Sequence, residues 1–229
     1  IRKQTEQAGI GYYAIHLDNY DIQAELTATT RCGFQRYTFP QDREGARVLV
    51  DLHIPTEYDY VLSDIEIKKV GPNRIEGVSH QLSRNVWSND ADQDYRLYFV
   101  LEFDQPIQEM GGWTDGTVVK TEHLTGKDLK DAGLFLQFDV KQNPTVQVRS
   151  GISLVSLENA SLNLKTEISD PFGWSFDAVR DHQQAIWNEL PTARKKSASI
   201  IICIGRYAAG IFGVMLTDNG YQPIRKFSS

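Results

Sequence analysis

Apolar and polar residues alternate along most of the chain between residues 11 and 156. Alternation with a period of two predicts half-buried antiparallel strands, because successive side chains of a strand point to opposite faces of the sheet. Turn-forming pairs such as Asp18-Asn19 and Asn143-Pro144 separate the alternating segments. Many short strands at this spacing favour a mainly β fold, a sandwich or barrel, over a parallel sheet with interleaved helices. The clearest apolar faces are Ile22, Ala24 and Leu26; Val48, Val50, Leu52 and Ile54; Tyr95, Leu97, Phe99, Leu101 and Phe103; and Leu134, Leu136, Phe138 and Val140.

After Ser156 the spacing of the apolar residues changes from two to three and four. This spacing places them on one side of a helix, so we predict helices near residues 157–168 and 175–190, with Asp170 or Ser175 as the N-cap of the second. We therefore divide the chain into a β-sandwich domain at residues 1–156 and a helical linker at residues 157–190. The apolar positions of the two helices are Leu157, Ala160, Leu164 and Ile168, and Phe176, Val179, Ile186, Trp187 and Leu190.

The charge and the cysteine content exclude two classes of protein. The 229 residues carry a formal net charge of −6 and a pI of about 5.4, which argues against a nucleic-acid-binding surface. Two cysteines, Cys32 and Cys203, provide no disulfide framework. The first residue is Ile1, and the only methionines are Met110 and Met215, so we expect the chain to start inside a longer open reading frame or after processing.

Few motifs in the sequence carry recognisable chemistry. The run DADQD at residues 90–94 resembles the start of a calcium loop, but Tyr95 and Leu101 occupy the positions of its glycine and its bidentate glutamate, which favours a solvated turn. The sequence contains no zinc-ligand spacing, glycine-rich phosphate loop or G-x-S-x-G elbow. Glu25, Asp51 and Glu102 fall on predicted strands opposite the apolar positions, so we expect them to be exposed strand carboxylates.

Four segments carry more specific combinations of residues. They are GYYAIHLDNYDIQAELTATTRCGFQRYTFP at 11–40, RVLVDL at 47–52, the stretch from Trp87 to Ile107, and VQVRSGISLVSLENASLNLKTEI at 146–168 with FDAVRDHQQAIWNEL at 176–190. In this order they resemble the N-terminal domain of glycoside hydrolase family 92, the exo-acting α-mannosidases. The most specific parts are ELTAT followed by R-x-G and YTFP, and the run GIS-x-VS-x-ENA, although Gln35 stands where the family often has histidine.

The resemblance implies both a fold and an activity. The fold is a large antiparallel β-sandwich of the supersandwich, galactose-mutarotase-like kind, followed by two connector helices. The activity is calcium-dependent release of terminal mannose from glycans with inversion, in which one carboxylic acid protonates the leaving oxygen and a second carboxylate activates water. In the family the acid, the base and the calcium ligands come from a helical catalytic domain, which we expect after Leu190, so we assign no catalytic or metal-ligating residue here.

The resemblance also implies that the β domain packs against that catalytic domain and helps to wall the sugar pocket. Arg31, Trp87 and Trp113 are the candidate substrate-binding residues, because aromatic rings and guanidinium groups suit sugar contacts. Packing is the alternative role of each. We expect the isolated chain to hydrolyse no mannoside.

We also derive expectations for the location and stability of the chain, and we keep two alternative functions. The implied location is secreted, periplasmic or at the cell surface, without a membrane span. A non-catalytic carbohydrate-binding module and a structural adhesin-like domain are the alternative functions, which sequence flanking this chain would distinguish. Because the missing domain is expected to cover an apolar patch, we predict low stability for the isolated chain, with Phe176, Ile186 and Trp187 at the edge of that patch.

The tail at residues 191–229 differs from the rest of the chain. The run SIIICIGRYAAGIFGVML at 199–216 is mostly apolar, but it is shorter than the roughly 20 residues of a membrane span and carries Arg206 near its middle. The family continues here with another helix. One allowed regrouping of the codons for residues 198–218 restores the LYRSL and SDVNG elements of that helix, so we interpret the tail as out of frame. A genuine buried or membrane helix is the alternative.

Overall fold

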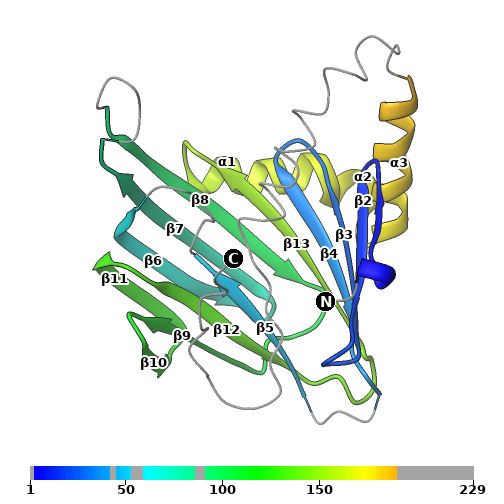
Figure 1. Ribbon diagram of the computed structural model, residues 1–229, viewed down its shortest axis with the longest axis horizontal. Coiled ribbons are helices and arrows are strands. Elements are labelled where there is room, and N and C mark those ends of the chain that lie inside the picture. The colour runs from blue at the N-terminus through cyan, green and yellow to red at the C-terminus, as the bar shows by residue number, and fades with distance from the viewer. Residues whose placement is uncertain (1–2, 42–44, 53–58, 86–90, 190–229) are drawn as a thin grey trace.

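The computed structural model describes residues 3–41, 45–52, 59–85 and 91–189. These residues form two β-sheets and a layer of helices (Figure 1). The large sheet has nine strands in the order β1-β2-β3-β4-β13-β8-β7-β6-β11, and the small sheet has four in the order β10-β9-β12-β5. Every neighbouring pair of strands is antiparallel. The predicted antiparallel β-sandwich, followed by helices, is therefore confirmed.

The strands have the following bounds. The large sheet consists of β1 (Gln7–Gly9), β2 (Tyr12–Leu17), β3 (Ile22–Ala28), β4 (Cys32–Thr38), β13 (Thr145–Ser153), β8 (Gln93–Phe103), β7 (Arg74–Ser83), β6 (Val61–Gly71) and β11 (His123–Leu129). The small sheet consists of β10 (Thr117–Lys120), β9 (Glu109–Thr114), β12 (Ala132–Phe138) and β5 (Ala46–Asp51). From β4 onward the chain passes repeatedly between the two sheets, so neither sheet is a separate unit.

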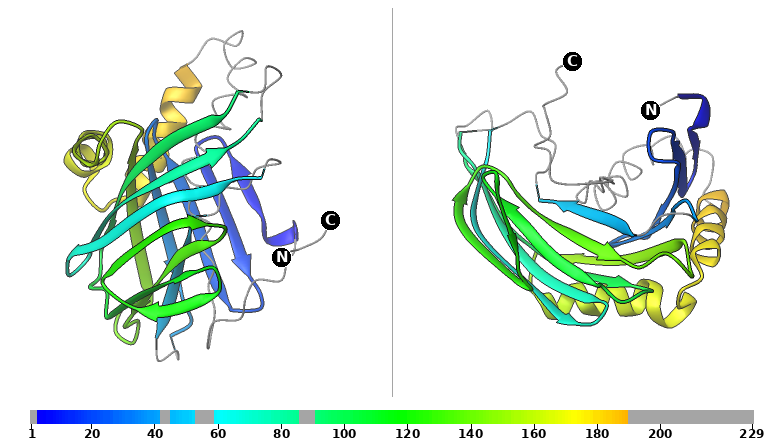
Figure 2. Two further views of the ribbon diagram at one scale, coloured as in Figure 1. Left: turned by 90° about the vertical axis from the view of Figure 1, so that its left-hand side faces the viewer. Right: turned by 90° about the horizontal axis from the view of Figure 1, so that it is seen from below.

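The first hydrophobic core lies between the two sheets. Val50 of β5, Leu134 of β12, and Phe99 and Phe103 of β8 are each at most 2% exposed. These are alternating positions predicted from the sequence, and their burial is the main force that holds the sheets together. Figure 2 shows the large sheet strongly curved, with the small sheet on its concave side.

The convex face of the large sheet is covered by helices (Figure 2). A 3-10 turn at Lys3–Thr5 precedes β1, and the chain after β13 forms α1 (Leu157–Leu164), a π-helix (Lys165–Ser169), α2 (Asp170–Phe172) and α3 (Phe176–Glu189). The second hydrophobic core, between these helices and the sheet, consists of Cys32, Phe34, Val100, Ala160, Leu164, Ile168, Phe176 and Val179. The central strands β3, β4, β13 and β8 of the large sheet are therefore covered on both faces, whereas β1, β6 and β11 have exposed positions.

Local side chains explain where the helices begin. The hydroxyl of Ser156 accepts a hydrogen bond from the N–H of Asn159 at 3.2 Å and caps α1. The hydroxyl of Ser175 accepts from the N–H of Ala178 at 3.4 Å at the start of α3. Between α2 and α3, Gly173 adopts a φ of 55°, a conformation that glycine reaches without strain. The predicted change of structure at Ser156 and the predicted cap at Ser175 are confirmed.

The predicted edge of an apolar patch is wrong at Phe176. This side chain is 1% exposed, because it is the first residue of α3 and turns toward the sheet, where its ring packs against Phe34 with 5.4 Å between the centroids. Ile186 is 41% exposed, and Trp187 is half-buried. The low stability of the isolated chain stays a prediction.

The tail at residues 191–229 lies outside the described residues, as do Trp87 and Cys203. Across the described ranges up to residue 189, no helix is both long enough and apolar enough to cross a membrane.

Gly151 of β13 allows α1 to approach the sheet closely. A Cβ at this position would lie 2.4 Å from the carbonyl oxygen of Ala160 and 2.8 Å from the Cβ of Leu164. We predict that Gly151→Ala lowers the free energy of unfolding by about 1–3 kcal/mol, the usual cost of overpacking, as measured by urea denaturation. Gly9→Ala is the matched control, because a Cβ there meets nothing within 4 Å. Equal stability of the two variants would contradict this packing of α1 on β13.

Candidate functional site

A polar row crosses the convex face of the large sheet where α3 begins. The register places Glu25 of β3 opposite Arg36 of β4, and Arg36 opposite Gln147 of β13. In the same way Thr38 of β4 lies opposite Thr145 of β13. Because the alternate residues of these strands face the first core, the five side chains point toward the helix layer.

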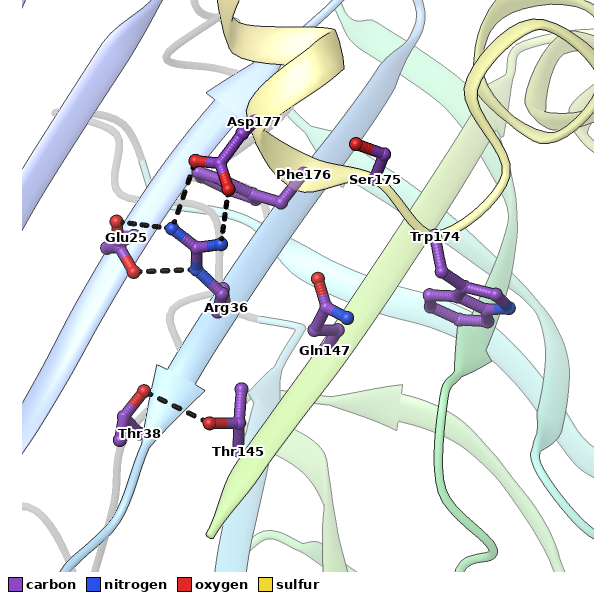
Figure 3. A pocket seen from close by; sticks show the side chains of 9 residues that line it. All are labelled: Glu25, Arg36, Thr38, Thr145, Gln147, Trp174, Ser175, Phe176 and Asp177. Carbon is purple, nitrogen blue, oxygen red and sulfur yellow. Dashed lines mark hydrogen bonds and ion pairs between the residues drawn. The ribbon is translucent and has the colours of Figure 1, made fainter. Parts of the chain in front are cut away.

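These five side chains form the floor of a pocket with a volume of about 430 Å³ (Figure 3). Trp174, Ser175, Phe176 and Asp177, from the turn before α3 and its first residues, form the wall. The volume falls in the range of roughly 300–1,000 Å³ that is typical of small-molecule sites. The pocket joins three strands to the helix that leaves the sandwich.

Arg36 holds the charged groups of the pocket together. Its Nε and Nη2 donate to the carboxylate of Glu25 at 2.7 and 2.8 Å, and its Nη1 and Nη2 donate to Asp177 at 3.1 and 3.3 Å. The guanidinium also lies 4.4 Å from the centroid of the Phe176 ring. Arg180 of α3 donates to Asp177 at 2.8 Å. Arg180 also binds Asp181 at 2.8 Å, so two guanidinium groups are shared among three carboxylates.

Both carboxylates of the pocket are ionised near neutral pH. The hydrogen bonds from Arg36 are the first cause that lowers the pKa of Glu25 below its ordinary value of 4.5. They are also the first cause that lowers the pKa of Asp177 below 3.8. A general acid has to carry a proton at the working pH, usually because burial raises its pKa. Neither Glu25 nor Asp177 therefore suits that role.

The described residues do not fit a calcium site. Calcium takes six to eight oxygen ligands, usually including several carboxylates. Within the described ranges, no group of three or more His, Cys, Asp or Glu side chains is placed to hold a metal ion. Glu25 and Asp177 are already bound to Arg36. In the DADQD run, Asp92 accepts a hydrogen bond from the backbone N–H of Asn85 at 3.1 Å.

Neither Arg31 nor Trp113, two of the residues predicted to bind substrate, lines this pocket. Arg31, in the turn before β4, donates through Nε to Glu167 of the π-helix at 2.6 Å, and its side chain is 57% exposed. Trp113 of β9 is 4% exposed and covers Gly133, where a Cβ would lie 2.1 Å from the indole ring. Trp87 lies outside the described residues. The substrate contacts of these three residues stay predictions. The contacts that the structure shows for Arg31 and Trp113 hold parts of the domain together.

The expectation of exposed strand carboxylates is wrong for Glu25 and Glu102. Their side chains are only 13% and 21% exposed, because the helix layer covers the face on which they lie. Arg149 donates to Glu102 through Nη2 at 2.7 Å and stacks on Trp174, with 3.7 Å between its Cζ and the ring centroid. Asp51 of β5 is half-buried.

The sequence reasoning missed Arg36, Gln147, Trp174 and Asp177. One signal was available for two of them, because the period of two puts Arg36 and Gln147 on the face that also carries Glu25. No spacing rule could connect Trp174 or Asp177 with these strands, since about 140 residues of chain separate Asp177 from Arg36.

The chain is similar to one family of glycoside hydrolases. The model of the glycosyl hydrolase family 92 N-terminal domain matches residues 1–153. The solved structure of a GH92 inverting mannosidase from Bacteroides thetaiotaomicron is 23% identical, has a TM-score of 0.65, and aligns with 82% of this chain and 23% of that chain. A GH92 α-mannosidase from the same organism is 22% identical, with a TM-score of 0.66 over 82% of this chain and 24% of that chain.

A third structure, of the GH92 family glycosyl hydrolase ccman5, is 25% identical, with a TM-score of 0.65 over 82% of this chain and 24% of that chain. This chain thus spans about a quarter of the length of the solved structures that it matches. A comparison with curated proteins finds no match.

Arg36 gives a testable contribution to stability. We predict that Arg36→Met lowers the free energy of unfolding at pH 7 by about 2–3 kcal/mol, because it leaves Glu25 and Asp177 without their shared partner. Urea denaturation measures the change. Lys127→Met on β11 is the control, because that side chain is exposed and should change stability by less than about 0.5 kcal/mol. Equal losses in the two variants would contradict the account.

The loss of unfolding free energy caused by Arg36→Met should become smaller as the pH falls. Glu25 and Asp177 have lowered pKa values in the folded protein, so their ion pairs stabilise it fully at any pH above the ordinary carboxyl pKa. This stabilisation is lost as the pH falls through the folded-state pKa values. Urea denaturation between pH 7 and about pH 3 should therefore show the gap between wild type and Arg36→Met narrowing in acid. A gap of constant size would contradict the ionised pairs.

Proposed function

The chain belongs to glycosyl hydrolase family 92, and on this premise we propose that it is the scaffold and pocket-wall domain of a calcium-dependent, inverting α-mannosidase. The parent enzyme removes terminal mannose from glycans. The observation that carries the proposal is the match of the family's N-terminal domain to residues 1–153. Two of the similar solved structures are of mannosidases, and one of these is described as inverting.

The catalytic groups of the proposed reaction belong to another domain of the parent enzyme. Inversion needs a carboxylic acid at the leaving oxygen and a carboxylate base on the opposite side of the sugar, roughly 6.5–9.5 Å apart. Glu25 and Asp177 are both ionised, which excludes them as the acid, and the hydrogen bonds from Arg36 lower the pKa of each, which makes both of them weak bases. We place the acid, the base and the calcium ligands in a helical domain of the parent enzyme, where calcium helps to hold the terminal mannose.

The role of this chain in that enzyme is to orient the catalytic domain that follows it. The second core and the pair between Arg36 and Asp177 attach α3 to the large sheet, so they set the direction in which the polypeptide leaves the sandwich. A catalytic domain joined there inherits this direction. We propose a secreted, periplasmic or cell-surface location, because glycans that end in mannose are met there.

If the catalytic groups lie in another domain, the isolated chain and the extended enzyme should differ in activity. The purified 229-residue chain should release no mannose from an α-linked mannobioside, because it lacks the catalytic carboxylates. The same chain extended by the catalytic domain of its parent gene should release mannose, and proton NMR should show the β-anomer first. Released mannose is measured by a coupled dehydrogenase assay.

Calcium provides the second arm of this test. A chelator should abolish the activity of the extended enzyme, and added calcium should restore it. Release of mannose by the 229-residue chain alone would overturn the assignment of the catalytic groups to another domain. First appearance of the α-anomer would overturn inversion, and activity that survives the chelator would overturn the calcium dependence.

A further inference from the structure

The pocket over β3, β4 and β13 offers a free hydrogen-bond acceptor at its centre. The side-chain amide of Gln147 donates through Nε2 to the carboxylate of Asp104 at 3.1 Å, and its backbone N–H donates to the same group at 2.8 Å. A carboxylate oxygen can only accept, so this contact fixes which end of the amide faces Asp104. The carbonyl oxygen Oε1 accepts no hydrogen bond from a described residue and points into the pocket (Figure 3).

Hydroxyl groups lie on both sides of this oxygen. Thr38 and Thr145 share one hydrogen bond of 3.3 Å between their hydroxyl oxygens, which leaves one hydroxyl proton free to donate. Ser175 uses its oxygen to cap α3, so its own proton is also free to donate. The pocket is therefore lined by both acceptors and donors, as a ligand with several hydroxyl groups requires.

Trp174 adds an apolar surface to this polar pocket. Its ring is held in place by Arg149, which stacks on one face at 3.7 Å, and by the edge of Phe34, whose centroid lies 6.1 Å away. The half-buried ring lines the pocket. A rigid aromatic surface beside hydroxyl and amide groups suits a sugar ring, which has C–H faces and polar edges.

The charges of the pocket favour a neutral ligand. Arg36 is paired with Glu25 and Asp177, and Arg180 with Asp177 and Asp181, so an anionic ligand finds no unpaired guanidinium group here. We propose that this pocket binds a neutral sugar residue of a glycan, through Gln147, Thr145 and Trp174. This site goes beyond the positional role proposed above and does not depend on the catalytic domain.

An NMR titration of the 229-residue chain tests the proposal. With methyl α-D-mannopyranoside as the probe, we expect saturable shifts of the Gln147 side-chain amide and the Trp174 indole signals, with a Kd of about 1–10 mM. Gln147→Leu and Thr145→Val should each weaken binding roughly fivefold or more, since each removes one hydrogen-bonding group. Trp174→Phe assigns the indole signal.

The controls separate binding from folding and from charge. Thr117→Val on the exposed strand β10 is the matched control and should leave the Kd unchanged, and urea denaturation checks that every variant is folded. Mannose 6-phosphate should bind more weakly than the neutral probe, because both nearby guanidinium groups are already paired and are outnumbered by carboxylates. Equal or tighter binding of the phosphate would overturn the neutral-sugar assignment.

Two further results would overturn the site itself. One is the absence of saturable shifts up to about 100 mM of the neutral probe. The other is binding that persists unchanged in folded Gln147→Leu and Thr145→Val variants. Either result leaves the family and the activity of the parent enzyme untouched, because those are tested by mannose release from the extended chain.

Discussion

The central strands of the large sheet, β3, β4, β13 and β8, have to bury both of their faces, and the rest of the structure depends on this requirement. The small sheet covers the concave face through side chains such as Leu134, and the helices cover the convex face through side chains such as Leu164 and Phe176. Removing either cover would expose a continuous apolar surface, which is unfavourable in water. The helices after Ser153 are therefore an integral part of the domain, although the family match ends at residue 153.

Polar contacts then fix each helical segment in one place on the sheet. Four of these contacts are made by arginines: Arg74 to Ser161 of α1, Arg31 to Glu167 of the π-helix, Arg149 to the carbonyl oxygen of Gly173, and Arg36 to Asp177 of α3. The apolar core supplies most of the stabilisation but little directional information, whereas a guanidinium fork specifies the geometry of its partner. In the proposed enzyme this arrangement sets the path of the chain toward the catalytic domain, and it creates the pocket beneath Trp174 as a consequence.

Sequence patterns predicted the strands and the two main helices because both have a strong local period. The positions Val50, Leu134 and Phe103 face the first core as the alternation requires. Periodicity identifies the polar face of a strand but carries no information about what covers it, so Glu25 was expected in solvent and lies under a helix. The pocket could not be predicted for the same reason, because it joins strands to a turn far along the chain. The resemblance to a family identified the enzyme class, which the geometry of the described residues alone does not specify.

Amide hydrogen exchange of the intact 229-residue chain, followed by mass spectrometry, tests the central claim that the helices belong to the same cooperative unit as the sheet. We predict that α1 and the first turns of α3 are protected from exchange to a similar degree as β4 and β13. All four elements should lose this protection together in dilute urea. Rapid exchange in α1 and α3, while β4 and β13 stay protected, would contradict the account.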